Sequence, residues 1–351
     1  MSTQSLAPGN GGIAAVARMT ATSLARRCPI EALACQDAAD YAIGAIKVRT
    51  FDDRRLPFLL ANLAAIRRAT HVIYDFAGTA RAHFDLPFRR PYAVWLHGWE
   101  TWHASSARYL RAMSGAALVL ANSDYTMARA EGSIRGGVNV IACPLGTVED
   151  EPPGHIGPSD GPPIVMLLGR ADELFAKGHD LLVEIWPEVT AAVPDARLVL
   201  VGGGPALGRV RDLAAASPAR RSIEITGFVV DDKLDACWRR ATMFAMPGFA
   251  EGFGLVYAEA MRRGLPVVAS TEDAGQEINL DGMTGFNVSR SDKKRLAEVI
   301  VILLRDRDLA RKLGAAGHVR WRERYSFSAF ERRLARALAP FFGEETGLST
   351  T

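Results

Sequence analysis

The sequence lacks the features of a metalloprotein, a disulfide-stabilised protein or a membrane-spanning protein. Only four of its 351 residues are cysteines, and they form no C-x-x-C pair and no Cys/His group with zinc-ligand spacing: Cys28, Cys35, Cys143 and Cys237. Isolated thiols in a chain of this length are typical of a reducing compartment. No apolar run reaches the roughly 18 residues that a spanning helix requires, and the longest, VIVILL at 299–304, fits one face of a buried helix.

Strong charge of either sign is also absent. The formal net charge is +3, with 23% charged and 48% apolar residues. Residues 1–150 contain 16 Lys/Arg and 12 Asp/Glu, against 26 and 27 in the remainder, so the small basic surplus lies in the first half. The surplus is too small to indicate a nucleic-acid-binding protein, and no stretch combines basic and aromatic residues. It does permit contact with an anionic membrane face. No secretory signal sequence opens the chain, and we predict a cytoplasmic protein that reaches the inner membrane face as a peripheral partner.

The clearest break in the chain is EDEPPGHIGPSDGPP at 149–163, which is dense in Pro, Gly and acidic residues and has no apolar period. The length favours two domains. We therefore predict a first domain over 1–150, a linker over 151–163, a second domain over 164–327, and a C-terminal helix over 328–351 that crosses back to the first domain.

On both sides of the break, short β-branched runs alternate with amphipathic helices. Buried strands of parallel sheets read as continuous apolar runs, and this alternation is typical of a doubly wound α/β sheet. The expected strands before the break are IEALACQ, AIKVRT, HVIYDFA, YAVWLHG, ALVLANS and NVIACPLG, and those after it are PIVMLLG, ARLVLVGGG, SIEITGF, TMFAMPG and LPVVAS. We predict two Rossmann-like domains that face each other across a cleft, with ligands at the carboxyl ends of the strands.

The start of the chain departs from this pattern. A glycine-rich turn, GNGGIA at 9–14, comes almost at once, and only the short, weakly apolar STQSLA is available as the strand before it. Two explanations stay open, a stunted first strand or a true start that lies upstream.

Two cations follow the first strand of the second half. Arg170 comes directly after the strand that ends at Gly169, and Lys177 precedes the next helix. A planar guanidinium and a compact ammonium at a strand end suit a diphosphate. Single Lys and Arg residues are more often solvated surface charges, but the position after a buried strand favours function. The later turn LVLVGGGPAL is equally compatible with a ligand loop or a tight turn, and it lacks the G-x-G-x-x-G of a nicotinamide dinucleotide site.

The stretch EGFGLVYAE at 251–259 places two glutamates around a glycine-rich helix start. The free N–H groups of a helix start stabilise an anion, and a carboxylate accepts hydrogen bonds from hydroxyl groups. Considered separately, Glu251 is most simply interpreted as an acidic residue at a helix start, and Glu259 as an acidic residue on a helix surface. Taken together with Gly252 and Gly254, they favour a site for a sugar, a phosphate and a ribose.

These motifs, with ITGFV at 225–229 and AMRRGLPVVAS at 260–270, resemble retaining glycosyltransferase family 4, which has the GT-B fold. The resemblance is strongest over 163–325. In the first half, GNGGIA, VWLHGWE at 94–100 and ANSDYT at 121–126 are similar to the pattern of the family's acceptor domain.

The resemblance implies that the first domain binds the acceptor and the second binds the nucleotide sugar, and it assigns a role to each of the following residues. Arg170 and Lys177 would hold the diphosphate, Glu251 would bind hydroxyl groups of the transferred sugar, and Glu259 would bind the ribose. The backbone of Gly227 and Phe228 would border the base, and the amides of Phe253, Gly254 and Leu255 would face the distal phosphate. In the first domain, Gly12 would approach the donor and His97 would lie near the reacting sugar.

The implied activity is a retaining transfer of a sugar from a nucleotide-diphosphate donor, GDP-mannose first and a UDP-hexose second, to a polysaccharide, oligosaccharide or glycolipid. No metal or other cofactor is expected, because no D-x-D pair follows a predicted strand. Two alternatives stay open: a GT-B sugar-nucleotide epimerase, and a non-catalytic nucleotide-sugar-binding subunit.

Overall fold

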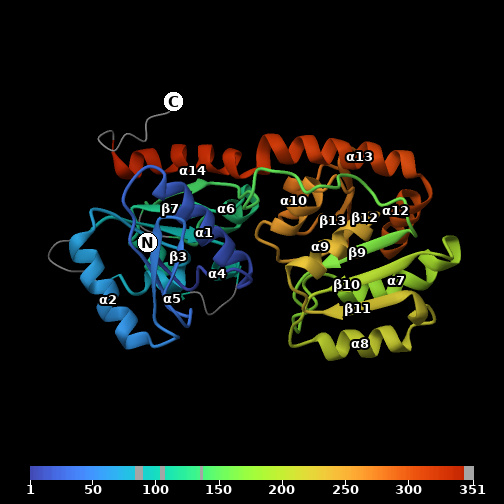
Figure 1. Ribbon diagram of the computed structural model, residues 1–351, viewed down its shortest axis with the longest axis horizontal. Helices are drawn as coiled ribbons and strands as arrows, with labels where there is room; N and C mark the ends of the chain where they lie inside the picture. Colours follow the sequence, from blue (N-terminus) through green and yellow to red (C-terminus); the bar gives the residue numbers. More distant parts are fainter. Residues whose placement is uncertain (84–89, 103–106, 135–136, 344–351) are drawn as a thin grey trace. The chain divides into compact units, whose positions relative to one another are not determined.

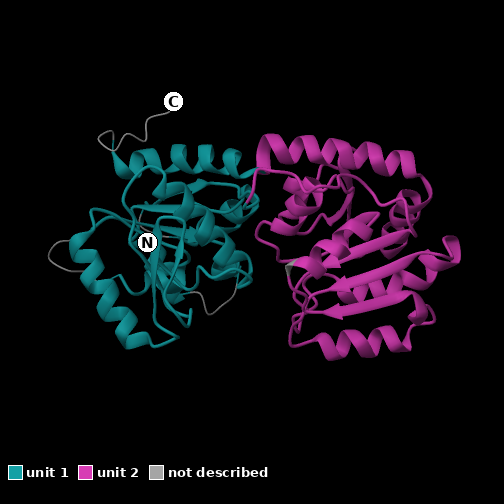
Figure 2. Cartoon of the chain, viewed as in Figure 1, with its two compact units in different colours: residues 1–148, 326–351 teal, residues 149–325 magenta. Residues whose placement is uncertain are grey.

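The computed structural model describes residues 1–83, 90–102, 107–134 and 137–343. The chain forms two compact units, Met1–Val148 with Ser326–Thr351 as unit 1 and Glu149–Tyr325 as unit 2 (Figure 2). Each unit is a sheet with helices packed on it (Figure 1). No helix in the described part of the chain is long and apolar enough to cross a membrane.

Unit 1 has an eight-stranded sheet in the order β3-β4-β2-β1-β5-β6-β7-β8. All its pairings are parallel except that of β3 with β4. The strands are β1 Ser2–Thr3, β2 Ala32–Ala34, β3 Tyr41–Ile43, β4 Ile46–Thr50, β5 Val72–Tyr74, β6 Tyr92–Leu96, β7 Leu118–Ala121 and β8 Asn139–Ala142. The helices of its first segment are α1 Gly11–Ala25, α2 Arg55–Arg68, α3 Ala77–Ala80, α4 Trp99–Trp102, α5 Ala107–Ser114 and α6 Asp124–Ala130.

The first strand is short, as the sequence suggests. β1 contains two residues, yet it pairs with both β2 and β5 inside the sheet. Strand β3 was not predicted from the sequence, because it has only three residues and they form no continuous buried run. It lies antiparallel to β4 at the sheet edge.

Unit 2 is a six-stranded, wholly parallel sheet in the order β11-β10-β9-β12-β13-β14. Val165, Met166 and Leu167 of β9 are fully buried, which reflects helices on both faces of the sheet. The strands are β9 Ile164–Leu168, β10 Arg197–Val201, β11 Ile223–Gly227, β12 Met243–Met246, β13 Val267–Ser270 and β14 Gly285–Val288. The helices are α7 His179–Ala192, α8 Leu207–Ala216, α9 Asp231–Arg240, α10 Leu255–Arg262, α11 Gly275–Ile278, α12 Lys293–Arg305 and α13 Arg307–Arg320.

The expected linker is held against unit 2. Backbone N–H groups of Gly157 and Ser159 donate to the carbonyls of Arg263 and Ala241, at 2.7 and 3.0 Å. The guanidinium of Arg307 donates to the carbonyl of Ser159 at 2.6 Å. The acidic and proline-rich composition therefore marks a change of unit at 148/149, while the segment itself packs as part of unit 2.

The last helix, α14 (Phe327–Phe342), belongs to unit 1. Its start is capped by Ser326, whose hydroxyl accepts from the N–H of Ala329. Phe330 is fully buried and stacks on Trp95 of β6 with ring centroids 6.2 Å apart, and Arg333 donates to the carbonyl of Pro144. The chain thus returns to its first unit at Ser326, while residues 344–351 of the predicted helical segment lie outside the described part.

Candidate functional site

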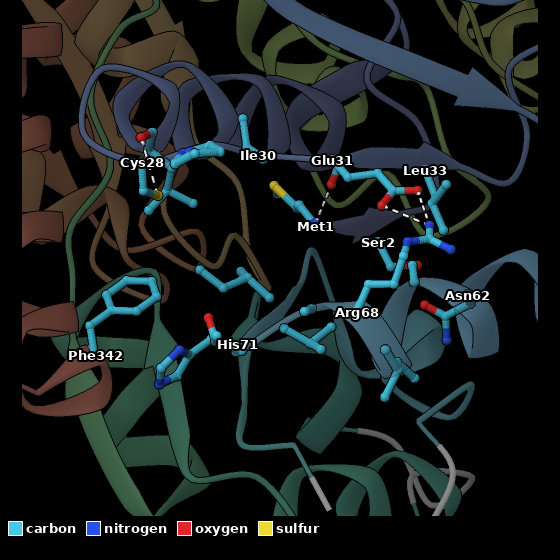
Figure 3. Close-up of a pocket in the computed structure, with 18 residues that line it drawn as sticks. Met1, Ser2, Cys28, Ile30, Glu31, Leu33, Asn62, Arg68, His71 and Phe342 are labelled. Atoms are coloured by element: carbon cyan, nitrogen blue, oxygen red, sulfur yellow. Dashed lines mark hydrogen bonds and ion pairs between the residues drawn. The ribbon is translucent and has the colours of Figure 1, made fainter. Parts of the chain in front are cut away.

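Unit 1 contains a cavity of about 540 Å³, shown in Figure 3. Its walls are mostly apolar, and at one side Arg68 pairs with Glu31 at 3.0 Å. Its lining includes Pro29–Glu31 and Thr70–His71, which lead into the amino ends of β2 and β5. Ligands of doubly wound sheets bind at the opposite, carboxyl edge. The cavity is therefore not at the edge of the sheet where a ligand site is expected.

The sheet of unit 2 has a topological switch point between β9 and β12. From β9 the chain moves outward through β10 and β11, and from β12 it moves to the other side through β13 and β14. The loops after β9 and β12 diverge at such a point and leave room for a ligand between them. Lys177 lies in the first loop and Glu251 in the second.

The structure brings Lys177 and Glu251 into contact. The Nζ of Lys177 donates to Oε2 of Glu251, and the side chains are only 24% and 18% exposed. Burial is the largest single influence and works against the charged form of Lys177, but the carboxylates of Glu251, Asp273 and Asp172 together outweigh it. The pKa of Lys177 therefore lies above its ordinary value. An ammonium held charged in a poorly solvated place is suited to a phosphate.

A third group, Asp273, joins them from the loop after β13 and was not predicted from the sequence. Its side chain is fully buried. Oδ1 accepts from the N–H of Gly275 at 2.8 Å, whereas Oδ2 has no hydrogen-bond partner among the described residues. Burial, and then the charge of Glu251, raise the pKa of Asp273 to about 7. We call Lys177, Glu251 and Asp273 the switch-point cluster.

Glycines allow the loops after β9 and β10 to approach closely. A Cβ atom on Gly202 would lie 2.2 Å from the carbonyl oxygen of Gly169, and one on Gly204 would lie 2.3 Å from that of Ala171. Both glycines have positive φ, at 126° and 143°. Two of the three glycines after β10, Gly202 and Gly204, are therefore required by the backbone packing.

The two loops that carry Lys177 and Glu251 contain strained backbone. Phe175 and Ala250 adopt left-handed conformations with φ of 52° and 59°. The loops are joined by the N–H of Phe249, which donates to the carbonyl of Ala176 at 2.8 Å. Strain of this kind is found where a surrounding structure holds functional groups in place.

The start of α10 has the geometry predicted for an anion-binding helix end. Gly254 has φ of 91°, and a Cβ there would lie 2.3 Å from the ring of Tyr257. Tyr257 is buried and donates from its hydroxyl to the carbonyl of Met246 at 2.7 Å. No side chain of the described residues caps this helix start. The amides of Phe253, Gly254 and Leu255 thus belong to a helix end that an anion would stabilise.

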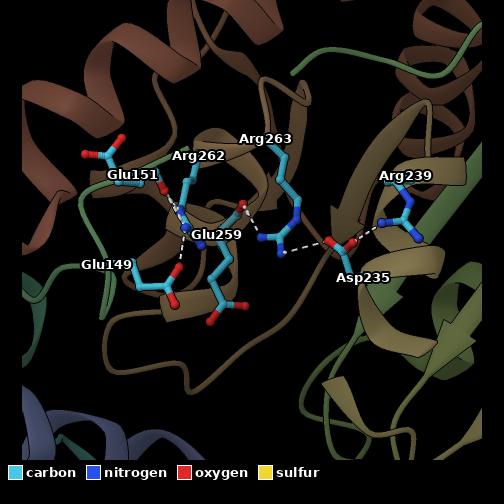
Figure 4. A network of polar contacts seen from close by, with 7 residues as sticks. All are labelled: Glu149, Glu151, Asp235, Arg239, Glu259, Arg262 and Arg263. Carbon is cyan, nitrogen blue, oxygen red and sulfur yellow. Dashed lines mark hydrogen bonds and ion pairs between the residues drawn. The ribbon is translucent and has the colours of Figure 1, made fainter. Parts of the chain in front are cut away.

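Glu259 lies one turn into α10 beside a network of ion pairs (Figure 4). Arg262 pairs with Glu149, and Arg263 donates to the backbone carbonyl of Glu259 at 3.3 Å. Figure 4 shows the Glu259 carboxylate pointing away from these contacts. Burial raises the pKa of Glu259, while Arg263 and Arg262 oppose that shift. This carboxylate therefore keeps its acceptor atoms for another group.

The other predicted residues of unit 2 end neighbouring strands. Arg170 is exposed directly after β9, and no hydrogen bond or ion pair of its side chain is found within the described part of the chain. Gly227 ends β11 with φ of 70°, and Phe228 follows it with 72% of its surface exposed. An exposed aromatic ring at a strand end can stack on a flat ligand.

His97 and Gly12 lie in unit 1. Gly12 is exposed in the first turn of α1. His97 follows β6 and is buried, with Nε2 at 2.8 Å from the carbonyl oxygen of Asp75. Burial lowers its pKa to about 4, against a smaller effect of that carbonyl. His97 is therefore neutral at pH 7, with Nε2 donating and Nδ1 left as the acceptor nitrogen.

Asp75 and Glu100, neither of them predicted, surround His97. Glu100 accepts from the backbone N–H of His97 at 3.1 Å. Burial raises the pKa of both carboxyl groups to about 7. Across the described residues no three His, Cys, Asp or Glu side chains are grouped so as to hold a metal ion.

The comparisons with known proteins point to one family. Residues 162–306 match the family model described as Glycosyl transferases group 1. A GDP-mannose-dependent alpha-(1-6)-phosphatidylinositol monomannoside mannosyltransferase of Mycobacterium tuberculosis is 38% identical over 162 residues, which are 44% of this chain and 42% of that protein. A GDP-mannose-dependent monoacylated alpha-(1-6)-phosphatidylinositol monomannoside mannosyltransferase of Corynebacterium glutamicum is 31% identical over 211 residues, which are 58% of this chain and 54% of that protein. The chain thus aligns with about half the length of these relatives.

Solved structures resemble nearly the whole chain. Sucrose-phosphate synthase of Thermosynechococcus elongatus matches with a TM-score of 0.78 and 21% identity over 95% of this chain and 94% of its own. Anabaena HepE in complex with UDP-glucose matches with a TM-score of 0.75 and 18% identity over 96% and 98%. At this identity the likeness establishes the fold.

Proposed function

Because residues 162–306 match the group 1 glycosyltransferases and the chain has the GT-B fold, we propose that the protein transfers a sugar from a nucleotide-diphosphate donor to an acceptor. The observation that carries the proposal is the pairing of Lys177 with Glu251 at the switch point of unit 2. Both residues lie within the matched segment, between exposed Arg170 and the uncapped start of α10.

Each group has a role that its chemistry supports. Departure of a nucleoside diphosphate develops negative charge, which Lys177, Arg170 and the α10 amides stabilise without reorganising; each well-placed donor contributes about 3–4 kcal/mol. Glu251 accepts hydrogen bonds from hydroxyl groups of the transferred sugar, and Glu259 from the ribose. Gly227 and Phe228 border the base.

We propose GDP-mannose as the first donor and a UDP-hexose as the second. GDP-mannose is named for the mannosyltransferase relatives, and UDP-glucose is bound in the HepE structure. The same relatives are named for phosphatidylinositol mannosides, which supports a glycolipid acceptor. The retaining outcome is part of the proposal. A neutral His97, whose Nε2 donates to the Asp75 carbonyl, is the unit 1 group proposed to lie near the transferred sugar.

The test is donor consumption with and without acceptor. Purified protein is incubated with labelled GDP-mannose or UDP-glucose, alone and with bacterial glycolipid extract. We expect release of nucleoside diphosphate together with label in the lipid, with the α-anomer formed from an α-linked donor. An epimerised donor without an acceptor would identify the epimerase alternative, and donor binding without any turnover would identify the non-catalytic one.

We predict that the reaction needs no divalent metal, because Arg170 and Lys177 supply positive charge beside the diphosphate. Activity should be unchanged in chelator. The control is the same sample with added magnesium or manganese. A complete loss in chelator that either metal restores would contradict this prediction.

We also predict reversible binding to anionic membranes through α2. Leu56 and Leu60 are 67% and 60% exposed on this helix, and Arg55 and Arg67 flank them. Apolar side chains between basic ones favour an interfacial position, and each basic residue adds about 1 kcal/mol near an anionic surface.

Flotation with phosphatidylserine vesicles at low salt measures this binding. Leu56→Ser combined with Leu60→Ser should reduce the floated fraction, whereas Leu213→Ser on α8 of unit 2, also exposed, should not. Absence of wild-type protein from the floated fraction at low salt would remove the membrane contact from the account.

A further inference from the structure

The buried carboxyl group of Asp273 is the part of the switch-point cluster that the roles above leave unused. Resting on the proposed function, we propose that Asp273 is a positioning residue for the nucleoside diphosphate: its carboxyl group carries a proton in the binding-competent state, and loss of that proton to solvent weakens diphosphate binding. Its charge would act through Lys177 and Glu251.

The position of Asp273 places this charge at the seam between the two catalytic loops. The N–H of its neighbour Ala274 donates to the backbone carbonyl of Glu251 at 3.1 Å, which ties the loop after β13 to the loop that carries Glu251. A Cβ atom on Gly248 would lie 3.1 Å from Oδ2 of Asp273 and 3.6 Å from Cα of Lys177. The unpartnered Oδ2 is therefore turned toward the loops that carry the ion pair.

The groups that face Asp273 come from several elements. Glu251, after β12, disfavours its ionisation, whereas Lys177, after β9, and Arg290, after β14, favour it. Tyr257 of α10 stays neutral, because burial and then the charge of Asp273 raise the pKa of its hydroxyl well above the ordinary value. Burial is the largest influence, and the pKa of Asp273 rises to about 7.

The charge balance explains why protonation matters. With Asp273 neutral, Lys177 and Glu251 together carry no net charge, and an arriving diphosphate can take over the ammonium. With Asp273 ionised, the cluster has a net negative charge in a poorly solvated place and repels the diphosphate. Diphosphate binding should in turn raise the pKa of Asp273, and each unit of that rise corresponds to a tenfold change in affinity.

Asp273→Asn separates this role from a purely structural one. Asparagine keeps an oxygen for the N–H of Gly275 and cannot ionise. Calorimetric titration with GDP and with UDP from pH 5.5 to 8.5 should show wild-type affinity falling roughly tenfold as the pH rises through 7. The variant should bind with nearly constant affinity over the same range.

Two controls sharpen the comparison. Asp195→Asn, at an exposed site before β10, should follow the wild-type pH profile. Asp75 and Glu100 in unit 1 also have pKa values of about 7, so only the difference between wild type and Asp273→Asn assigns the titration. Equal slopes for the two proteins would overturn the inference. Failure of wild type to bind either nucleotide at any pH would overturn the proposed function, and this inference with it.

A stability measurement tests the buried proton independently of any ligand. The folded-state pKa of about 7 is above the ordinary 3.8, so between these values the folded chain binds more protons than the unfolded one. The contribution of Asp273 to stability is therefore present at low pH and is lost as the pH rises toward 7. The melting temperature of wild type should fall relative to that of Asp273→Asn between about pH 4 and 7, and parallel melting curves would contradict the inference.

Discussion

Lys177→Ala is expected to lower the turnover number roughly 100- to 1,000-fold, because it removes a preorganised cation whose stabilisation grows as the diphosphate leaves. This ammonium is held by Glu251 in surroundings that keep its pKa above the ordinary value. Arg170→Ala should have a similar effect, since the exposed guanidinium at the end of β9 supplies the second cation.

The measurement is steady-state kinetics over a range of donor concentrations, after each variant is shown to melt at the wild-type temperature. Lys294→Ala provides the matched control, because Lys294 is exposed on α12 and is assigned no role in the site. The effects of Lys177→Ala and Glu251→Ala should not add in the double variant, since the two side chains are in contact. Near-normal turnover in both cation variants would contradict the site assignment.

Glu251→Ala and Glu259→Ala are expected to separate into two kinetic classes. Glu251 contacts the transferred sugar in the proposed complex, so its loss should lower the turnover number. Glu259 contacts the ribose equally in the ground and transition states, and its loss should mainly raise the Michaelis constant for the donor. The carboxylate orientation in Figure 4, away from Arg262 and Arg263, supports a ligand contact for Glu259.

The same donor titration distinguishes these classes, with Glu188→Ala on the exposed face of α7 as the control. If Glu251 and Glu259 act only as helix-end acids, both variants will lose melting temperature and keep normal kinetic constants. That result would remove both residues from the site.

Three strands of unit 2 could be predicted from the sequence because nearly all of their residues are buried. PIVMLLG, ARLVLVGGG and TMFAMPG read as apolar runs for that reason, and the structure contains β9, β10 and β12 within them. β14 (Gly285–Val288) was missed because its two middle residues, Phe286 and Asn287, are only partly buried and break the run. The resemblance to the glycosyltransferase family and the GT-B fold are confirmed.

The site was only partly accessible from sequence. Lys177 and Glu251 follow buried strands, and a switch point makes strand ends meet, so their proximity could be anticipated. The role of Asp273 could not be anticipated, because STEDAGQE contains three acidic residues. Only the structure, in which Asp273 packs beside Gly248 and Gly275, shows which of the three is buried. The Asp75 carbonyl that accepts from His97 was equally hidden, since β5 and β6 bring the two residues together, whereas Glu100 lies only three residues after His97.

The most direct test of the central claim, that the switch point of unit 2 binds a nucleoside diphosphate, is a comparison of GDP, UDP, GMP and UMP by thermal unfolding in chelator. A ligand at 100 times its dissociation constant should stabilise the wild type by about 2.7 kcal/mol. We predict that one diphosphate stabilises the protein more than its monophosphate does, and that Lys177→Ala abolishes the difference. Equal effects of diphosphate and monophosphate, or no stabilisation by any of the four, would contradict the account.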